Sequence, residues 1–260
     1  MRKGVVLAAL VLTACGGARA ERVELSGRQD SRAYRLGGFE SVSLEGPDRV
    51  IVRVGGAAGV SAAGDSAVLD QLEVRVERGA LKIGRKRNGW TSVNGDRERA
   101  VITVTVPRLA AAAVAGSGEM TVDRVAGGSF AAAVSGSGDL RVDEVRGAAI
   151  SAAVAGSGDL TVARAAVRRA ELSMAGSGDL RVAGTAGTVA ASIAGSGDID
   201  ASGLQGATGQ VSIAGSGNAA IRAQDAAQVS IVGSGDALVH GTANCQVSKL
   251  GSGGARCGLG

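Results

Sequence analysis

The chain has 260 residues, with 43 glycines, only 2 prolines and a formal net charge of +4 at pH 7. Abundant glycine without proline-rich tracts is typical of a protein with many tight turns and excludes a disordered proline/glycine segment. The small net charge, and the absence of basic runs interleaved with aromatic residues, argue against a nucleic-acid partner. A chain of this length can bury a sizeable core in one domain.

Residues 1–14 predict an export signal. Arg2 and Lys3 supply a basic start, and the apolar run that follows is shorter than the roughly 20 residues that a membrane-spanning helix needs. Leu12-Thr13-Ala14-Cys15 resembles a bacterial lipobox, in which the cysteine thiol is diacylated. We therefore expect an outer-membrane lipoprotein that contacts the membrane only through a lipid on Cys15.

Residues 15–38 then form a lipid-anchored tether that leads into the folded part. An alternative is ordinary signal cleavage after Ala18-Arg19-Ala20, which fits the small-x-small pattern and would leave a soluble periplasmic or secreted protein. Both interpretations predict that the protein leaves the cytoplasm.

Residues 39–115 predict short strands without a fixed period. Turn residues such as Gly46-Pro47-Asp48 and Asn94-Gly95-Asp96 separate apolar alternations such as Val50/Val52/Val54. We interpret this stretch as broad, irregular first coils of the repeat architecture that follows, closing its near end. A separate small β-domain is the alternative.

Residues 116–260 are organised around the phrase Gly-Ser-Gly, usually followed by an acid or amide. The phrase occurs eight times, at spacings of 20, 20, 20, 19, 20, 18 and 18 residues, and starts at Gly116, Gly136, Gly156, Gly176, Gly195, Gly215, Gly233 and Gly251. Self-similarity at a period of this length is typical of a solenoid, in which each repeat is one coil.

Apolar residues at steps of two flank each phrase. In the first copy they include Val114 before the glycines and Met120 and Val122 after them. This alternation predicts two short strands per coil, each with one inward face. The sequence therefore predicts an all-β protein: a single-chain parallel β-solenoid, right-handed and β-helix-like, with coils of roughly 20 residues spaced about 4.8 Å apart.

The last coil predicts a disulfide cap. Cys245 and Cys257 stand six residues before and six after Gly251, on inward positions, and an exported protein meets an oxidising compartment. Two buried free thiols are the alternative. Lys249 occupies a position that is apolar in every earlier coil, so we expect it to belong to the same cap. No metal is expected there, because two cysteines and His240 fall short of four ligands.

An acidic column follows the glycine phrases: Glu119, Asp139, Asp159, Asp179, Asp198 and Asp236, with Asn218 among them. One hypothesis is a line of Ca²⁺ sites, as in nonapeptide β-rolls. The other is that each acid accepts hydrogen bonds from nearby backbone N–H groups while water solvates its charge. One carboxylate per coil undersupplies the 6–8 oxygens that Ca²⁺ takes, which favours the second hypothesis.

A second candidate surface is a flat strip of small residues. Three positions before each phrase, alanine in the early coils gives way to the serine strip, Ser173, Ser192, Ser212, Ser230 and Ser248. Such a strip is a candidate for binding a sheet, a polymer or a second copy. Alternatively, tight stacking tolerates only small residues at these positions.

The phrases Phe39-Glu40-Ser41-Val42, Leu81-Lys82-Ile83 and Ile102–Leu109, leading into repeated Gly-Ser-Gly-Asp, resemble the bacterial autotransporter adhesin head GIN domain family over about residues 39–260. The resemblance implies a β-solenoid exported to the envelope, commonly lipid-anchored and without established catalytic residues. No translocator barrel follows the last coil, so we do not expect this chain itself to be an autotransporter.

Enzyme chemistry is not expected, and neither is a cofactor. The aromatic residues that sugar platforms use are reduced to Trp90, Tyr34, Phe39 and Phe130, and His240 has no credible partner. The sequence predicts a non-enzymatic adhesin or envelope scaffold that presents a repetitive surface to an unknown protein or polysaccharide. The alternatives are a Ca²⁺-dependent rod and, less in keeping with the sequence, a carbohydrate-active β-helix enzyme.

Overall fold

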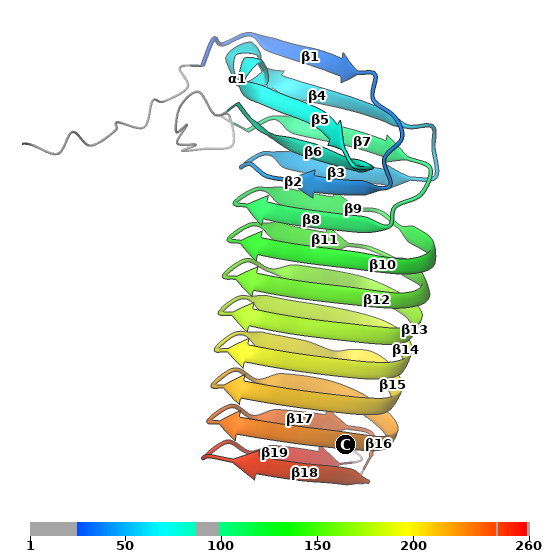
Figure 1. Ribbon diagram of the computed structural model, residues 1–260, viewed down its shortest axis with the longest axis vertical. Coiled ribbons are helices and arrows are strands. Elements are labelled where there is room, and N and C mark those ends of the chain that lie inside the picture. The colour runs from blue at the N-terminus through cyan, green and yellow to red at the C-terminus, as the bar shows by residue number, and fades with distance from the viewer. Residues whose placement is uncertain (1–24, 87–98, 243, 259–260) are drawn as a thin grey trace, which may run out of the picture.

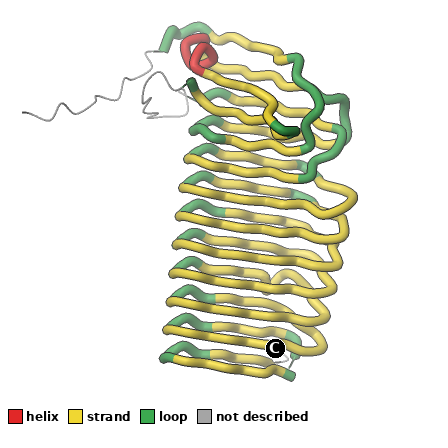
Figure 2. The backbone as a smooth tube through the Cα atoms, in the orientation of Figure 1, coloured by secondary structure: helices red, strands yellow, loops and turns green. Residues whose placement is uncertain are grey.

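The computed structural model describes residues 25–86, 99–242 and 244–258. Cys15 and Trp90 lie outside the described residues. The described chain is almost entirely strand, wound into the stacked coils seen in Figures 1 and 2. The predicted parallel β-solenoid is confirmed.

Each coil contributes one strand to a front layer and one to a rear layer. In the first Gly-Ser-Gly coil these are β8 (Ala111–Gly116) and β9 (Glu119–Val122), joined by the glycine turn. The chain runs one way in the front layer and returns in the rear layer while the coils descend, which makes the superhelix right-handed (Figure 1).

The later strands repeat this arrangement. In chain order they are β10 (Val125–Gly136), β11 (Asp139–Val142), β12 (Val145–Gly156), β13 (Leu160–Gly176), β14 (Asp179–Gly195), β15 (Asp198–Gly215), β16 (Ala219–Gly233), β17 (Ala237–His240), β18 (Cys245–Leu250) and β19 (Ala255–Gly258). β13 to β16 each continue from the rear layer into the front layer, and all these strands pair in parallel with the equivalent segments one coil on.

The unequal repeat lengths are absorbed on the side of the coil away from the glycine turn. Pairing shifts register between Val162 and Ala165, and again between Arg181 and Gly184. The positions around the glycine phrase remain aligned throughout, as Gly176↔Gly195 shows across the 19-residue repeat. Residues at a given distance from the phrase therefore form straight columns along the rod.

The inward columns form one continuous core. Two positions before the phrase, Val114, Val134, Val154, Met174, Ile193, Ile213 and Ile231 are each 1% exposed. Apolar burial of this kind is the main favourable contribution to folding. These columns belong to the same hydrophobic cluster as the N-terminal strands.

The glycine turns stack so closely that a side chain does not fit. Gly156 has a φ of +138°, a conformation that favours glycine. A Cβ on Gly158 would clash with the carbonyl oxygen of Gly138 in the preceding coil. The turn N–H groups of Ser157 and Gly158 donate instead to the carbonyl of Gly136, at 2.9 and 3.0 Å.

The solenoid begins one coil earlier than its glycine phrase. β2 (Ser41–Leu44) and β3 (Arg49–Val54) pair in parallel with β8 and β9. Their turn, Glu45–Asp48, packs against the glycine turn of the next coil. The contact is so close that a Cβ added to Gly118 would clash with the carbonyl oxygens of Asp48 and Gly46.

The next elements in the sequence lie on the other side of this coil. β6 (Ala80–Arg85) pairs in parallel with β2, and β7 (Val101–Val106) pairs in parallel with β3. The order of the N-terminal coils in space therefore differs from their order in the chain.

Within residues 39–115, β2, β3, β6 and β7 pair in parallel as coils of the solenoid, whereas the outermost strands are antiparallel. β4 (Gly59–Asp65) pairs antiparallel with β7, and β5 (Leu72–Glu77) pairs antiparallel with β6. β1 (Gln29–Tyr34) extends the sheet antiparallel to β4. Part of the expected tether, residues 15–38, is thus a strand, because its backbone completes the sheet edge.

A short helix covers this end of the core. α1 (Ser66–Gln71) connects β4 in one layer to β5 in the other and buries Val68 and Leu69 completely. Asp65 caps it by accepting a hydrogen bond from the Ala67 N–H at 2.9 Å. The N-terminal end of the solenoid is therefore closed by regular structure.

Candidate functional site

The serine strip lies in register on the outer face of the front layer. Ser173, Ser192, Ser212, Ser230 and Ser248 are paired from coil to coil, and all are exposed. Their inward neighbours along each strand, such as Ile193 and Ile213, are buried. Strand alternation thus holds the serines outward at the spacing of the coils.

A second outward column makes the face beside the strip nearly free of long side chains. In the last two coils this column continues with the larger Val232 and Leu250. One position before the first six phrases stand Ala115, Ser135, Ala155, Ala175, Ala194 and Ala214, all exposed. We call these residues together with the serine strip the small-residue face. A shallow depression of about 390 Å³, lined in part by Thr188, Thr208, Gln210 and Gln228, borders it.

The acidic column follows the turns at the start of the rear-layer strands, and its carboxylates join successive coils. Asp159 accepts a hydrogen bond from the backbone N–H of Asp179 at 3.0 Å. Asp198 accepts one from the N–H of Asn218 at 2.8 Å, and Asp236 accepts one from Gly254 at 2.7 Å. The bonded N–H groups belong to the next coil, so the column contributes to stacking.

Ion pairs engage part of the column as well. Glu119 pairs with Arg49 at 3.1 Å, and Asp179 pairs with Arg181 at 2.6 Å. Over the ranges that the structure describes, no group of three or more histidine, cysteine or acidic side chains is arranged to hold a metal ion. The geometry of the column therefore fits backbone hydrogen bonding.

Arginines surround one acid on the side of the coils away from the glycine turns. Arg146 donates to Glu144 at 2.5 Å, and with Arg164 and Arg124 nearby it lowers the pKa of Glu144, although partial burial opposes this shift. Arg124 is also 3.8 Å from a carboxylate oxygen of Asp123, so part of the arginine charge is paired within the cluster.

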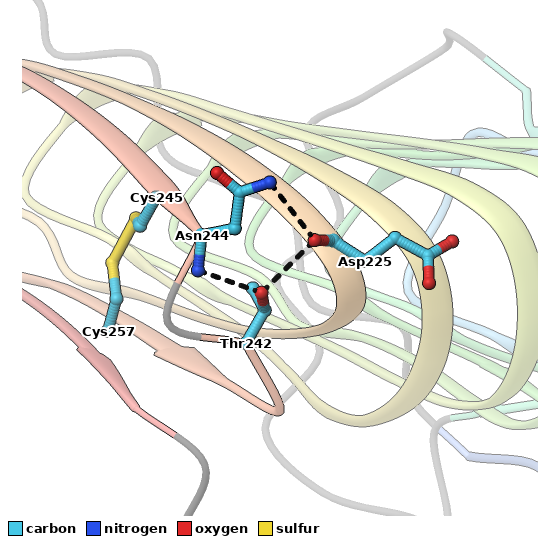
Figure 3. Close-up of a disulfide and its surroundings, with 5 residues drawn as sticks. All are labelled: Asp225, Thr242, Asn244, Cys245 and Cys257. Carbon is cyan, nitrogen blue, oxygen red and sulfur yellow. Dashed lines mark hydrogen bonds between the residues drawn. A yellow bond between two sulfur atoms is a disulfide. The ribbon is translucent and has the colours of Figure 1, made fainter.

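The predicted disulfide is present. Cys245 in β18 and Cys257 in β19 are bonded, with their Cα atoms 6.4 Å apart, and the bond joins the two layers (Figure 3). Closing a loop of this length contributes about 2–3 kcal/mol to stability. The Nζ atom of Lys249 donates to the carbonyl of Gly253 at 3.5 Å.

The turn before β18 is held by a small network. The hydroxyl of Thr242 donates to the carbonyl of Asp225 at 3.2 Å and accepts from the Asn244 N–H at 3.0 Å (Figure 3). The last coil is therefore fixed to the one before it by side chains as well as by strand pairing.

The remaining residues considered for catalysis are dispersed. Phe39 and Phe130 are buried in the core, and Tyr34 is half-buried, which raises the pKa of its hydroxyl. His240 ends β17 near the far end of the rod. The structure does not bring these side chains together.

One buried polar pair was not anticipated. Asp48 is fully buried, and its carboxylate accepts from the Arg85 guanidinium at 2.7 and 3.1 Å and from the Ala100 N–H at 2.9 Å. The partners are 37 and 52 residues away in sequence, so no local pattern could reveal the pair. It joins β6 and the start of β7 to the turn of the first coil.

Among the residues described, no helix combines the length and the apolar character needed to cross a bilayer.

Three solved structures share this fold across 92% of this chain and 100% of theirs. A "Putative lipid binding protein" from Parabacteroides distasonis is 24% identical, with a TM-score of 0.79. A "putative adhesin" from the same species is 21% identical and one from Parabacteroides merdae is 18% identical, each with a TM-score of 0.81. No curated protein matches the chain. The family profile described as "Putative auto-transporter adhesin, head GIN domain" matches residues 38–243, and the chain belongs to this family.

Proposed function

We propose that the protein is a non-enzymatic, adhesin-like binding protein of the bacterial envelope and that it binds through the small-residue face. The observation that carries this proposal is the unbroken register of short outward side chains from Ser173 to Ser248. The adhesin names of the family and of two neighbours agree with it.

The regular spacing and the low side-chain entropy of this face both favour binding. Serine hydroxyls that recur about every 4.8 Å match a partner with repeating polar groups, such as a polysaccharide or the face of another sheet. Short side chains also lose little rotamer freedom when a partner covers them, which lowers the cost of binding. Alanine is a poor strand former, so its frequency on an exposed face calls for a cause beyond strand stability.

The family and the disulfide indicate an exported or surface protein. We further propose that Cys15 carries lipid and anchors the protein to the outer membrane. Mass spectrometry of the mature protein from membranes tests this: a diacylated N-terminal Cys15 supports the anchor, and an unmodified N-terminus after Ala20 contradicts it.

The binding proposal is tested with a charge placed on each layer in turn. Ser212→Glu introduces a carboxylate into the middle of the small-residue face, whereas Thr161→Glu introduces one on the rear layer, where Leu160 and Val162 on either side point inward. The variants and the wild type are compared on an array of bacterial and host polysaccharides, matrix proteins and lipid vesicles.

We expect Ser212→Glu to lose at least tenfold in affinity for whichever probe the wild type binds, and Thr161→Glu to bind as the wild type does. Equal binding by all three proteins would contradict a role for this face. The melting temperature of each variant is measured alongside, so that a loss of folding is not mistaken for a loss of binding.

A further inference from the structure

The C-terminal end of the solenoid is an open sheet edge. Within the described residues, β18 pairs only with β16 and β19 only with β17, so their outer edges have no neighbour. Val247 is 47% exposed, whereas its counterpart one coil earlier, Val229, is completely buried. The inward residues of the last coil therefore face solvent where another coil would otherwise cover them.

Exposed apolar side chains are concentrated in the last two coils, with Val247 on the edge itself and the others on the outer faces of the two layers. Of the six large apolar side chains exposed among the described residues, four lie in the last two coils: Val232, Leu238, Val247 and Leu250. Leu250 is 73% exposed. An edge with unpaired backbone groups and apolar side chains is a template for pairing with another chain.

The opposite end is built differently from this edge. α1 covers the core there, and the antiparallel strands β1, β4 and β5 extend the two layers beyond the parallel coils. β1 and β5 are themselves edge strands, but α1 covers the core between the layers there, so the open C-terminal end has its best match in the same end of a second copy. Two copies that meet through these ends are related by a two-fold axis. Such an arrangement closes at a dimer and does not grow into a fibre.

Lys249 is the second-last residue of β18 on this edge. It continues the inward column that contains Ile231, Ile213 and Met174, but it is exposed and carries a charge. Docking a second copy on this edge would remove the lysine ammonium groups from water, which is costly unless each is paired. Inward-pointing charges on edge strands are a known means of preventing edge-to-edge association.

We propose that the open C-terminal end is a self-pairing surface for a second copy of this chain and that Lys249 keeps it unpaired. Lys249 thereby maintains the wild-type protein as a monomer. The disulfide between Cys245 and Cys257 holds the two layers of this end together, so that Lys249 keeps its place in the column.

The test is the mass in solution of the full mature chain, by light scattering coupled to size exclusion. Lys249→Met removes the charge and keeps a long side chain that the same column already accepts at Met174. We expect the wild type and the charge-conserving Lys249→Arg control to have the mass of a monomer, and Lys249→Met to have twice that mass.

Two further measurements establish where the copies meet. In the Lys249→Met dimer, amide hydrogen exchange of β18 and β19 should slow at least tenfold relative to the wild type. Adding Val247→Glu to Lys249→Met should restore the monomer by placing a new charge at the edge.

A monomeric Lys249→Met protein with a normal circular dichroism spectrum would overturn the proposal, as would a wild-type protein that is already dimeric. Open-ended polymers of the variant would contradict the two-fold arrangement. If Lys249→Met does not fold, Lys249→Gln is measured in the same way and judged by the same masses.

Discussion

Asp48 is the single side chain on which the joint between the first coil and the N-terminal strands depends most. Its carboxylate is fully buried against Arg85, whose side chain is only 8% exposed. Removing one member of a buried ion pair leaves the other charge desolvated. Disrupting the pair would therefore lower the stability of this joint.

We expect Asp48→Ala to lower the free energy of unfolding by about 3 kcal/mol, measured by urea denaturation. The matched control is Asp143→Ala, which removes the acid of an exposed pair with Arg141 and should cost less than about 1 kcal/mol. Equal losses in the two variants would show that the buried pair has no special weight.

Asp65 gives the stability of the N-terminal end a defined pH dependence. Burial raises the pKa of Asp65, but hydrogen bonds from Ser26, Gly27 and Ala67 outweigh it and lower the pKa below its usual value. A lowered pKa in the folded state means that the stabilisation is complete above the unfolded pKa, about 3.9. It is lost as the pH falls through the folded pKa.

The wild type should therefore lose stability more steeply than Asp65→Asn as the pH falls below about 4. Melting temperatures at closely spaced pH values from neutral to strongly acidic test this expectation. Parallel curves for the two proteins would mean that Asp65 does not contribute through its charge.

For single residues, the sequence predicted a structural role only at positions that recur from coil to coil. The inward columns and the alignment of Cys245 with Cys257 follow from counting residues around Gly251, because every coil obeys the same geometry. Asp48 occurs once, and its role depends on Arg85 being folded back from a strand that is distant in sequence. Nothing in the neighbourhood of Asp48 indicates that contact.

The element that sets the architecture is the glycine turn. The third residue of each phrase packs against the carbonyl of the equivalent glycine one coil earlier, as Gly158 does against Gly138. An added methyl group would have to push two backbone turns apart. The central serine, in contrast, points into solvent at Ser157.

We expect Gly158→Ala to destabilise the protein by about 2–3 kcal/mol through overpacking. Ser157→Ala, one residue away in the same turn, should change stability by less than about 0.5 kcal/mol. Chemical denaturation of the two variants tests whether glycine is required at this position because any side chain would clash with the neighbouring turn. A tolerated Gly158→Ala would mean that the coils are not stacked this closely.

The carboxylates of the acidic column stabilise coil stacking by accepting backbone hydrogen bonds. Mutation can distinguish this role from ion binding. Asp159→Ala removes the acceptor for the Asp179 N–H and should cost about 1 kcal/mol, whereas Asp159→Asn retains an acceptor oxygen and should cost much less. Melting temperatures measured with calcium and with EDTA should be the same. A higher melting temperature with calcium would revive the ion-binding hypothesis.

Strands were predicted correctly in the repeats and also before them, as β3 over Val50/Val52/Val54 shows, but the stacking of the strands before the repeats was not predicted. The turn Glu45–Asp48 occupies the position of a Gly-Ser-Gly turn in the stack. Proline and aspartate replace the serine and the second glycine, so the sequence did not reveal this position. Strand order was also missed, because pairing of β2 with both β6 and β8 is decided by tertiary contacts. Alternation along a strand does not indicate its partner.

At the scale of the whole molecule, the two ends of the rod differ. The N-terminal end is covered by α1 and antiparallel strands, while the C-terminal end relies on a disulfide and Lys249. Repeat proteins require such terminal caps because an end coil has only one neighbour. The outer faces of the two layers lie between these ends, and they include the small-residue face proposed for binding.

The small-residue face, the acidic column and the open edge all depend on coils stacked in register. Spin-label distances along one outward column measure that register directly. Ser135 and Ala214 are four coils apart, and Ser135 and Leu250 are six coils apart in the same column.

Cysteine substitution and labelling of each pair, followed by pulsed electron paramagnetic resonance, gives the two separations. At about 4.8 Å per coil the account predicts roughly 19 and 29 Å, and a difference of about 10 Å that is independent of the label's length. Two separations that are equal, or that differ by much more than two coil spacings, would contradict the stacked register.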